Sequence, residues 1–110
     1  MIKVIFYKDS DDCYTGFQLK GHAGFAAYGQ DIVCAGVSAL AINTVNSIEK
    51  FTSDRFQYKV DEEKGLIDLR FFSKVSKETT LLLDSLWLGL NGIQEENSGY
   101  LSVKTRRWKP

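Results

Sequence analysis

Alternating apolar and polar residues mark five short segments of the chain as β-strands. In one of them Phe17 and Leu19 share a face, while Gln18 and Lys20 fall on the other. Turn-forming residues at 9–12 and at 61–65 separate the first two segments and the next two, so each pair is expected to form a hairpin. The predicted strands are residues 2–8, 14–20, 56–60, 66–71 and 100–105.

A longer segment has the periodicity of an amphipathic helix. Val37, Ala41, Val45 and Ile48 recur at spacings of four, four and three residues, and Phe51 follows three residues later. This predicts a helix that runs from about residue 32 to this phenylalanine. Its first half is rich in small residues, which suits a close helix neighbour, a backbone approach to a ligand, or ordinary tight packing.

A second helical segment is apolar over most of its circumference. Leu82, Leu86, Leu90 and Ile93 form a stripe at helical spacing, and further leucine and tryptophan residues widen it. A helix of this kind is usually buried on two sides. In so small a domain we expect the second side of the helix at residues 76–95 to meet another protomer, which predicts a homodimer.

The elements follow one another in the order ββαββαβ, with no repeat or low-complexity stretch. This order predicts one α+β domain over residues 1–110, in which an antiparallel or mixed sheet is packed with two helices. A chain of 110 residues can bury a core without a metal or a disulfide. Its composition, 44% hydrophobic and 25% charged, is typical of globular proteins.

The charges of the chain cancel, because 14 basic residues balance 14 acidic ones. This balance gives no strong electrostatic reason to bind nucleic acid or a membrane, and we expect neither as a direct partner. The C-terminal end is locally basic and aromatic and could contact RNA or an anionic peptide, but it is more typical of a frayed, solvated terminus. It contains Lys104, Arg106, Arg107, Trp108 and Lys109.

The N-terminal segment has only a short apolar run, far below the length of a signal peptide or a membrane span. We therefore expect a cytoplasmic protein. Structural disulfides are uncommon in that compartment, so Cys13 and Cys34 are interpreted as free thiols.

Reactive side chains gather between the second strand and the first helix. The stretch from Gly21 to Ser38 contains Cys34 and the only histidine, His22. Between them lies a small-residue segment without clean periodicity, which predicts a loop with freedom to move. The residues of this loop are Ala23, Gly24, Phe25, Ala26, Ala27, Tyr28, Gly29 and Gln30.

This arrangement suits nucleophilic catalysis by a thiol. Asp31 precedes the helical pattern and is a natural N-cap, which puts Cys34 in the first turn, where the helix dipole favours the thiolate. If the loop folds back, His22 reaches the thiol as general base and then serves as general acid. The backbone N–H groups of Cys34, Ala35 and Gly36 are candidate oxyanion donors.

Other interpretations stay open on spacing alone. A cysteine at the start of an apolar helix is commonly a small buried hydrophobe, and a lone histidine is commonly a loop residue. Cys13, His22 and Cys34 lack the close ligand pairs of a zinc site, and we expect no metal or cofactor. The aspartates at 9–12 lack the glycine and glutamate of an EF-hand and are better interpreted as a solvated turn. A disulfide between the two cysteines would indicate a redox sensor.

The same stretch resembles the ribosomal-processing cysteine proteases of Firmicutes and related bacteria. The resemblance rests on Gly21-His22-Ala23 and on the run Tyr28-Gly29-Gln30-Asp31-Ile32-Val33-Cys34-Ala35-Gly36-Val37-Ser38. It extends over the whole chain in length and element order. A histidine followed at this distance by Asp-Ile-Val-Cys-Ala is far more specific than a bare histidine–cysteine pair.

The resemblance implies a small cytoplasmic homodimer that removes a short N-terminal extension from large-subunit ribosomal protein twenty-seven. The nucleophile of the family falls on Cys34 and its histidine on His22, and supporting roles fall on Asp31 and Ser38. Because the extension ends in apolar and aromatic residues, an apolar groove is expected near the site, with residues 23–30 as a flap over the peptide. The alternative is a non-catalytic ribosome-assembly or ribosomal-protein-binding factor.

Overall fold

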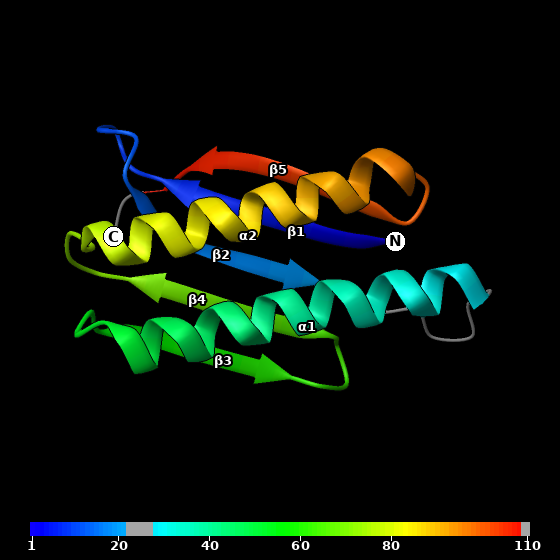
Figure 1. The fold of residues 1–110 in the computed structure, drawn as a ribbon, viewed down its shortest axis with the longest axis horizontal. Coiled ribbons are helices and arrows are strands. Elements are labelled where there is room, and N and C mark those ends of the chain that lie inside the picture. Colours follow the sequence, from blue (N-terminus) through cyan, green and yellow to red (C-terminus); the bar gives the residue numbers. More distant parts are fainter. Residues whose placement is uncertain (22–27, 109–110) are drawn as a thin grey trace.

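The computed structural model describes residues 1–21 and 28–108, with the backbone alone for 28–31. Strands and helices follow in the predicted order ββαββαβ (Figure 1). Each predicted strand is present within one or two residues of its expected ends. The elements are β1 (Ile2–Lys8), β2 (Tyr14–Lys20), α1 (Tyr28–Phe51), β3 (Phe56–Asp61), β4 (Leu66–Phe71), α2 (Lys77–Glu96) and β5 (Leu101–Arg107).

The five strands form one mixed sheet in the order β3-β4-β2-β1-β5. Both predicted hairpins are confirmed as antiparallel pairs, and β2 also pairs with β4 in antiparallel fashion. The closing strand β5 returns alongside β1 and pairs with it in parallel. The register sets Val4 opposite Leu19 and Phe6 opposite Phe17, so these apolar side chains share one face of the sheet.

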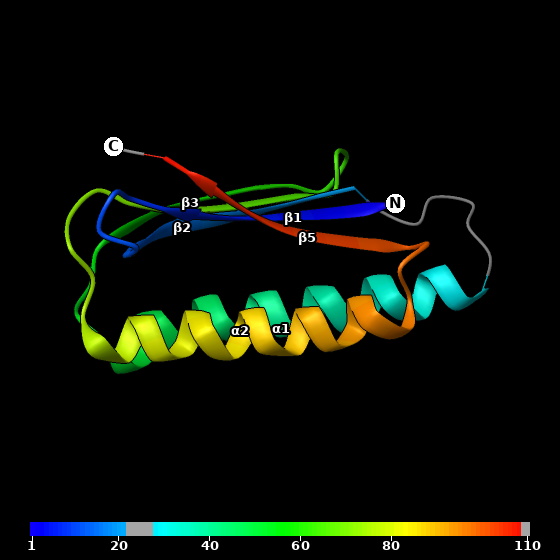
Figure 2. The ribbon, with the colours of Figure 1, turned by 90° about the horizontal axis from the view of Figure 1, so that it is seen from above.

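Both helices cover this apolar face, so the molecule has two layers (Figure 2). Side chains from alternate strand positions and from one stripe of each helix fill the space between the layers. The other face of the sheet carries no helix or strand from the described part of the chain. The largest fully buried side chains are Phe6, Phe17, Phe71, Ile2, Ile48, Leu69, Leu83, Leu90, Leu101, Val4, Val37 and Val45.

The stripe predicted for the first helix is buried at its four inner positions, from Val37 to Ile48. Its last member, Phe51, is 71% exposed, so the extension of the stripe to this residue is wrong. Phe51 is the final residue of α1. The segment Ile32–Phe51 is long and apolar enough to cross a membrane, but a core helix passes the same test, and here the apolar stripe packs into the core.

Small residues let the two helices approach each other closely. A Cβ atom placed on Gly89 of α2 would lie 3.2 Å from Cδ1 of Leu40, and one on Gly36 of α1 would lie 3.8 Å from Cδ1 of Ile93. The contact at Gly89 of α2 is tight, whereas the one at Gly36 is an ordinary contact distance, so ordinary packing is sufficient to explain Gly36 in the first helix.

The start of α2 is fixed by a polar cluster. Ser76 is the N-cap and its Oγ accepts a hydrogen bond from the Thr79 N–H at 3.2 Å. The carboxylate of Asp54, from the α1–β3 connection, accepts hydrogen bonds from Ser76 N, Ser76 Oγ and the buried Thr79 hydroxyl. These contacts join the α1–β3 connection to the beginning of α2.

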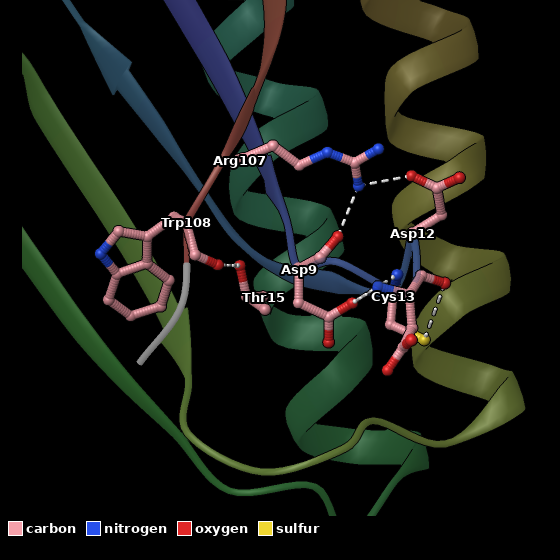
Figure 3. Close-up of polar contacts among 7 residues, drawn as sticks. Asp9, Asp12, Cys13, Thr15, Arg107 and Trp108 are labelled. Atoms are coloured by element: carbon pink, nitrogen blue, oxygen red, sulfur yellow. Dashed lines mark hydrogen bonds and ion pairs between the residues drawn. The ribbon is translucent and has the colours of Figure 1, made fainter.

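The C-terminal end is ordered as far as Trp108, so the expected fraying is wrong for this part. The backbone N–H of Trp108 donates a hydrogen bond to Lys8 O at 2.9 Å, and its backbone carbonyl accepts one from Thr15 Oγ1 at 3.4 Å. Figure 3 shows that Arg107 reaches the Asp9 carbonyl and the Asp12 carboxylate in the β1–β2 turn. Because β5 pairs with β1 along its whole length, Arg107 and Trp108 lie beside the end of β1 and the β1–β2 turn.

Candidate active site

Cys34 is half-buried on the wall of a pocket of about 230 Å³. It lies on α1, and Ser38 and Ile42 follow at intervals of four residues on the same face of the helix. The facing wall comes from the end of β2 and from the β3–β4 hairpin. The lining residues are Leu19, Gly21, Cys34, Ser38, Ile42, Val60, Asp61, Glu62, Gly65, Leu66 and Ile67.

Glycines shape the wall opposite the thiol. Gly21 has φ +108°, and a Cβ atom there would lie 2.7 Å from the Met1 carbonyl oxygen, so the position requires glycine. Its N–H donates to Gly65 O at 3.2 Å, which joins the end of β2 to the hairpin. Gly65 has φ +61° and donates to Glu62 O, closing the turn between β3 and β4.

The pocket is mainly apolar with an acidic rim. Leu19, Ile42 and Val60 contribute apolar side chains, as do the first two residues of β4, while Asp61 and Glu62 lie at the hairpin. This agrees with the apolar groove expected near the thiol. An apolar side chain of a bound peptide would be removed from water here, at a gain of about 25 cal/mol for each Å² buried.

The predicted partners of Cys34 divide into two groups. His22 and residues 23–27 lie outside the described residues. Residues 28–30 belong to α1, so their assignment to the flexible loop is wrong. Extending a helix from a packed segment gains one hydrogen bond for each residue fixed, and this outweighs the cost of Gly29.

The early start of α1 also changes the role of Asp31. As the fourth residue of the helix it is not the N-cap, and that prediction is wrong. The N–H groups of Cys34, Ala35 and Gly36 lie beyond the first four helical residues, so they donate to carbonyl groups within the helix. Their assignment as free oxyanion donors is therefore also wrong. Ser38 offers a hydroxyl donor from the same wall of the pocket.

The two cysteines are free thiols. Cys13 lies in the β1–β2 turn, at the opposite end of the sheet from the N-terminal half of α1 (Figure 1). This separation is incompatible with a disulfide between them in this fold. Among the side chains of residues 1–21 and 32–108, no group of three or more His, Cys, Asp or Glu is placed to hold a metal ion.

A larger hollow, of about 540 Å³, lies beside the β1–β2 turn and includes Cys13. Asp9 and Tyr14, two of its polar residues, form hydrogen bonds within the fold. Asp9 Oδ1 accepts hydrogen bonds from the Asp11 and Cys13 N–H groups at 2.8 and 3.1 Å, which makes this an Asx turn (Figure 3). Tyr14 donates to Asp84 of α2 at 2.7 Å, and burial together with this carboxylate raises the pKa of the tyrosine. The smaller pocket at Cys34 is therefore the candidate site.

Comparison with known proteins identifies the family. The model of the family "Cysteine protease Prp" matches residues 1–102. The chain belongs to the Prp family of cysteine proteases. It is 34% identical over 96 residues to the ribosomal processing cysteine protease Prp of Staphylococcus aureus, covering 87% of this chain and 91% of the relative.

Two solved structures of the S. aureus Prp share this fold. One holds a substrate peptide and superposes with a TM-score of 0.90 at 30% identity, covering 96% of this chain and all of the other. The second holds a covalently linked product peptide, with a TM-score of 0.86, 31% identity and the same coverage. The resemblance inferred from the His22 and Cys34 motifs is thus confirmed at the level of the family.

The hairpin side of the pocket was not predicted. The turn at residues 61–65 was expected, but nothing in its sequence indicates that it faces Cys34. That contact depends on β4 pairing with β2, which places the hairpin tip beside the end of β2. Gly65, which closes the turn with a positive φ and accepts the Gly21 N–H, holds the hairpin at this place.

Proposed function

We propose that this chain is an endopeptidase in which Cys34 is the nucleophile and His22 the general base, and that it removes a short N-terminal extension from large-subunit ribosomal protein twenty-seven in the cytoplasm. One observation carries the proposal: Cys34 and Gly21 line the same apolar pocket, and His22 directly follows Gly21 in the chain. The covalently linked product peptide in the S. aureus relative supports covalent chemistry in this family.

The reaction is an acyl transfer in two steps. Sγ of Cys34 attacks the scissile carbonyl as His22 takes the thiol proton, and the C–N bond breaks when His22 gives that proton to the leaving amine. Water then attacks the thioester, again with His22 as base, and frees the carboxyl product and the thiol. Ser38, one turn along the helix from Cys34, is proposed as a donor to the developing oxyanion.

Apolar residues at the end of the extension would occupy the pocket floor. Leu19, Ile42 and Ile67 supply a surface that has no polar group to satisfy, so the fit selects by size and hydrophobicity. Residues 22–27 connect Gly21 to α1 in the sequence, and we propose that 23–27 cover the bound peptide while His22 acts on the thiol.

The test is cleavage of a synthetic peptide that spans the extension and its junction. Cys34→Ala should abolish cleavage, and His22→Ala should lower kcat by about 10²- to 10⁴-fold, the usual contribution of a general base. Cys13→Ala removes the other thiol and should cleave like the wild type, because Cys13 lies at the far end of the sheet. Undiminished cleavage by both the Cys34 and the His22 variants would refute the proposal.

We further propose that the active form is a homodimer joined through the helix layer. Leu81 and Leu88 lie two turns apart on α2 and are each 69% exposed, and Trp87 and Ile32 add exposed apolar surface to the same layer. Exposure of this apolar helix face to water is unfavourable. In a symmetric dimer the same face of a second copy would cover it.

Sedimentation velocity tests the dimer. The variant Leu81→Glu/Leu88→Glu should sediment as a monomer at micromolar concentration. The control Lys3→Gln/Lys104→Gln changes the net charge by the same amount at exposed positions on the face of the sheet turned away from the helices and should sediment like the wild type. A wild-type protein that is monomeric at micromolar concentration would count against the proposal.

A further inference from the structure

The face of the sheet turned away from the helices, here called the open face, has an uneven charge distribution. By strand alternation its side chains include Lys3, Lys20, Lys59, Arg70, Lys104 and Arg106. The carboxylates at open-face positions are Asp68 and, at the end of β3, Asp61. Asp61 also lines the Cys34 pocket and accepts the Lys64 N–H in the turn. A chain with no net charge thus concentrates cations on one surface.

Only one of these six cations has a carboxylate partner within ion-pair distance in the described part of the chain. Arg70 contacts Asp68 through Nε at 2.7 Å and Nη2 at 3.1 Å, and Gln18 donates to the same carboxylate at 2.8 Å. Burial of Asp68 opposes ionisation, but these hydrogen bonds and nearby Lys59 lower the pKa of its carboxyl group. The charge of Arg70 is therefore already compensated within the protein.

The remaining cations repel one another. Lys3 and Lys20 are direct cross-strand partners, and both are exposed. Like charges at such positions destabilise a sheet. Lys104 and Arg106 add two more charges on neighbouring β5, and Lys59 adds one on β3 at the other edge. With about 4.8 Å between strands, five strands span about 19 Å, so the charges are distributed over a surface of about that width.

Aromatic and planar groups lie at one end of this surface. The Arg70 guanidinium is 3.9 Å from the centre of the Tyr7 ring and 4.6 Å from the Trp108 ring. It reaches Tyr7 across Gly16, which pairs with both residues and has no side chain to obstruct it. Trp108 and Arg70, with Gln57, also line an open hollow of about 520 Å³.

We propose that the open face binds single-stranded RNA, with the lysines and Arg106 on phosphates and the Trp108–Arg70 end stacking on bases. An acidic protein is a poorer match, since lysine is depleted from protein interfaces, whereas basic surfaces with stacking groups suit single-stranded nucleic acid. The choice of RNA over DNA rests on the proposed ribosomal function, because ribosomal RNA surrounds such a substrate. The open face is opposite the helix layer that carries Cys34 (Figure 2), so RNA and peptide need not compete.

Fluorescence anisotropy with a labelled twelve-nucleotide oligouridylate tests this. If five cations contact phosphates, the slope of log K against log[salt] is about −3.5, and affinity falls roughly 130-fold between 50 and 200 mM KCl. The variant Lys3→Gln/Lys104→Gln/Arg106→Gln should reduce this slope to about −1.4, with a fall of roughly sevenfold. The control Lys50→Gln/Lys74→Gln/Lys77→Gln has the same charge change at exposed positions elsewhere and should retain the wild-type slope.

Trp108→Ala separates stacking from charge. It should weaken binding by about tenfold at each salt concentration while the slope stays unchanged. The proposal would be overturned if the protein did not bind RNA at 50 mM KCl, or if the two triple variants lost RNA affinity equally. It would also be overturned if Trp108→Ala kept the wild-type affinity, or if a polyglutamate peptide competed as well as unlabelled RNA. The assay does not depend on catalysis by Cys34, so its failure and a failure of the peptidase proposal are distinguishable.

Discussion

Gly21 connects the strand β2 to the segment that carries His22, and replacing it with alanine should damage stability and activity together. Two features of the structure set the cost. Its φ of +108° lies in a region that side-chain-bearing residues rarely adopt, at a cost of about 1–3 kcal/mol. The added Cβ would also lie 2.7 Å from the backbone carbonyl oxygen of Met1, which would have to move.

The sum of strain and displacement is about 2–4 kcal/mol. A chain of 110 residues has an unfolding entropy of about 230 cal/mol/K near its midpoint, so each kcal/mol corresponds to about 4 °C. The Tm of Gly21→Ala should therefore be about 9–17 °C lower than that of the wild type. At temperatures where the variant remains folded, kcat/KM for the extension peptide should also fall, because Gly21 lines the Cys34 pocket and directly precedes the proposed base.

Gly99→Ala is the matched control for this substitution. A Cβ atom at Gly99 has no neighbour within 4 Å, and its φ lies outside the positive region. Thermal melts followed by circular dichroism and peptide cleavage at 20 °C would compare the two variants. If Gly21→Ala melts and cleaves like Gly99→Ala, the strand end does not constrain the site and the reasoning is refuted.

Three further substitutions test other parts of the structure. Asp54→Ala removes three hydrogen bonds at the start of α2 and should lower the free energy of unfolding, measured with urea, by about 3 kcal/mol. The control Glu49→Ala, at an exposed position, should stay within about 0.5 kcal/mol of wild type. Burial raises the pKa of Asp54, but hydrogen bonds from Ser76 and Thr79 outweigh burial and lower it. The stability that Asp54 contributes is therefore present above the ordinary pKa of 3.8 and is lost as pH falls through the lower pKa of the folded state. A stability difference between wild type and Asp54→Ala that grows on acidification would contradict this. Gly36→Ala should raise stability by up to about 1 kcal/mol, because the new methyl group meets only Ile93 at ordinary contact distance, and a lower Tm would show that the helices cannot accept it. Ser38→Ala should lower kcat by about 10²-fold if the hydroxyl serves the oxyanion, while Ser53→Ala on an exposed loop retains activity, and equal rates would exclude that role.

The fold was predictable because its local signals agree with one another. The alternation at Phe17 and Leu19, the stripe at Val37 to Ile48 and the turn glycine Gly65 each indicate the element that forms. These local signals did not predict that β5 would pair with β1 in parallel. This pairing depends on how α2 crosses the sheet, and the closing strand has the same alternation whichever edge it joins.

The sequence indicated which residues belong to the candidate site better than it indicated how they are arranged. Cys34 was found by its motif, but the start of its helix was placed four residues too late because Gly29 and its neighbours look like a loop. Glycine inside a helix costs about 1 kcal/mol, which the tertiary packing of a long helix overrides. The hairpin wall of the pocket is formed by residues distant in sequence, and such contacts leave no local signal.

The corrected helix start changes how the thiol can be activated. The field of a helix dipole falls off within the first turn, and Cys34 is the seventh residue of α1, so the helix end contributes less than a first-turn position would provide. The N–H groups near Cys34 are bonded within the helix, which removes a second source of assistance. Of the activating groups first considered, only His22 remains for the proton transfer. Under the proposed mechanism, the reactivity of Cys34 toward iodoacetamide at neutral pH should therefore depend strongly on His22, and a His22→Ala variant alkylated as fast as wild type would show that another group activates the thiol.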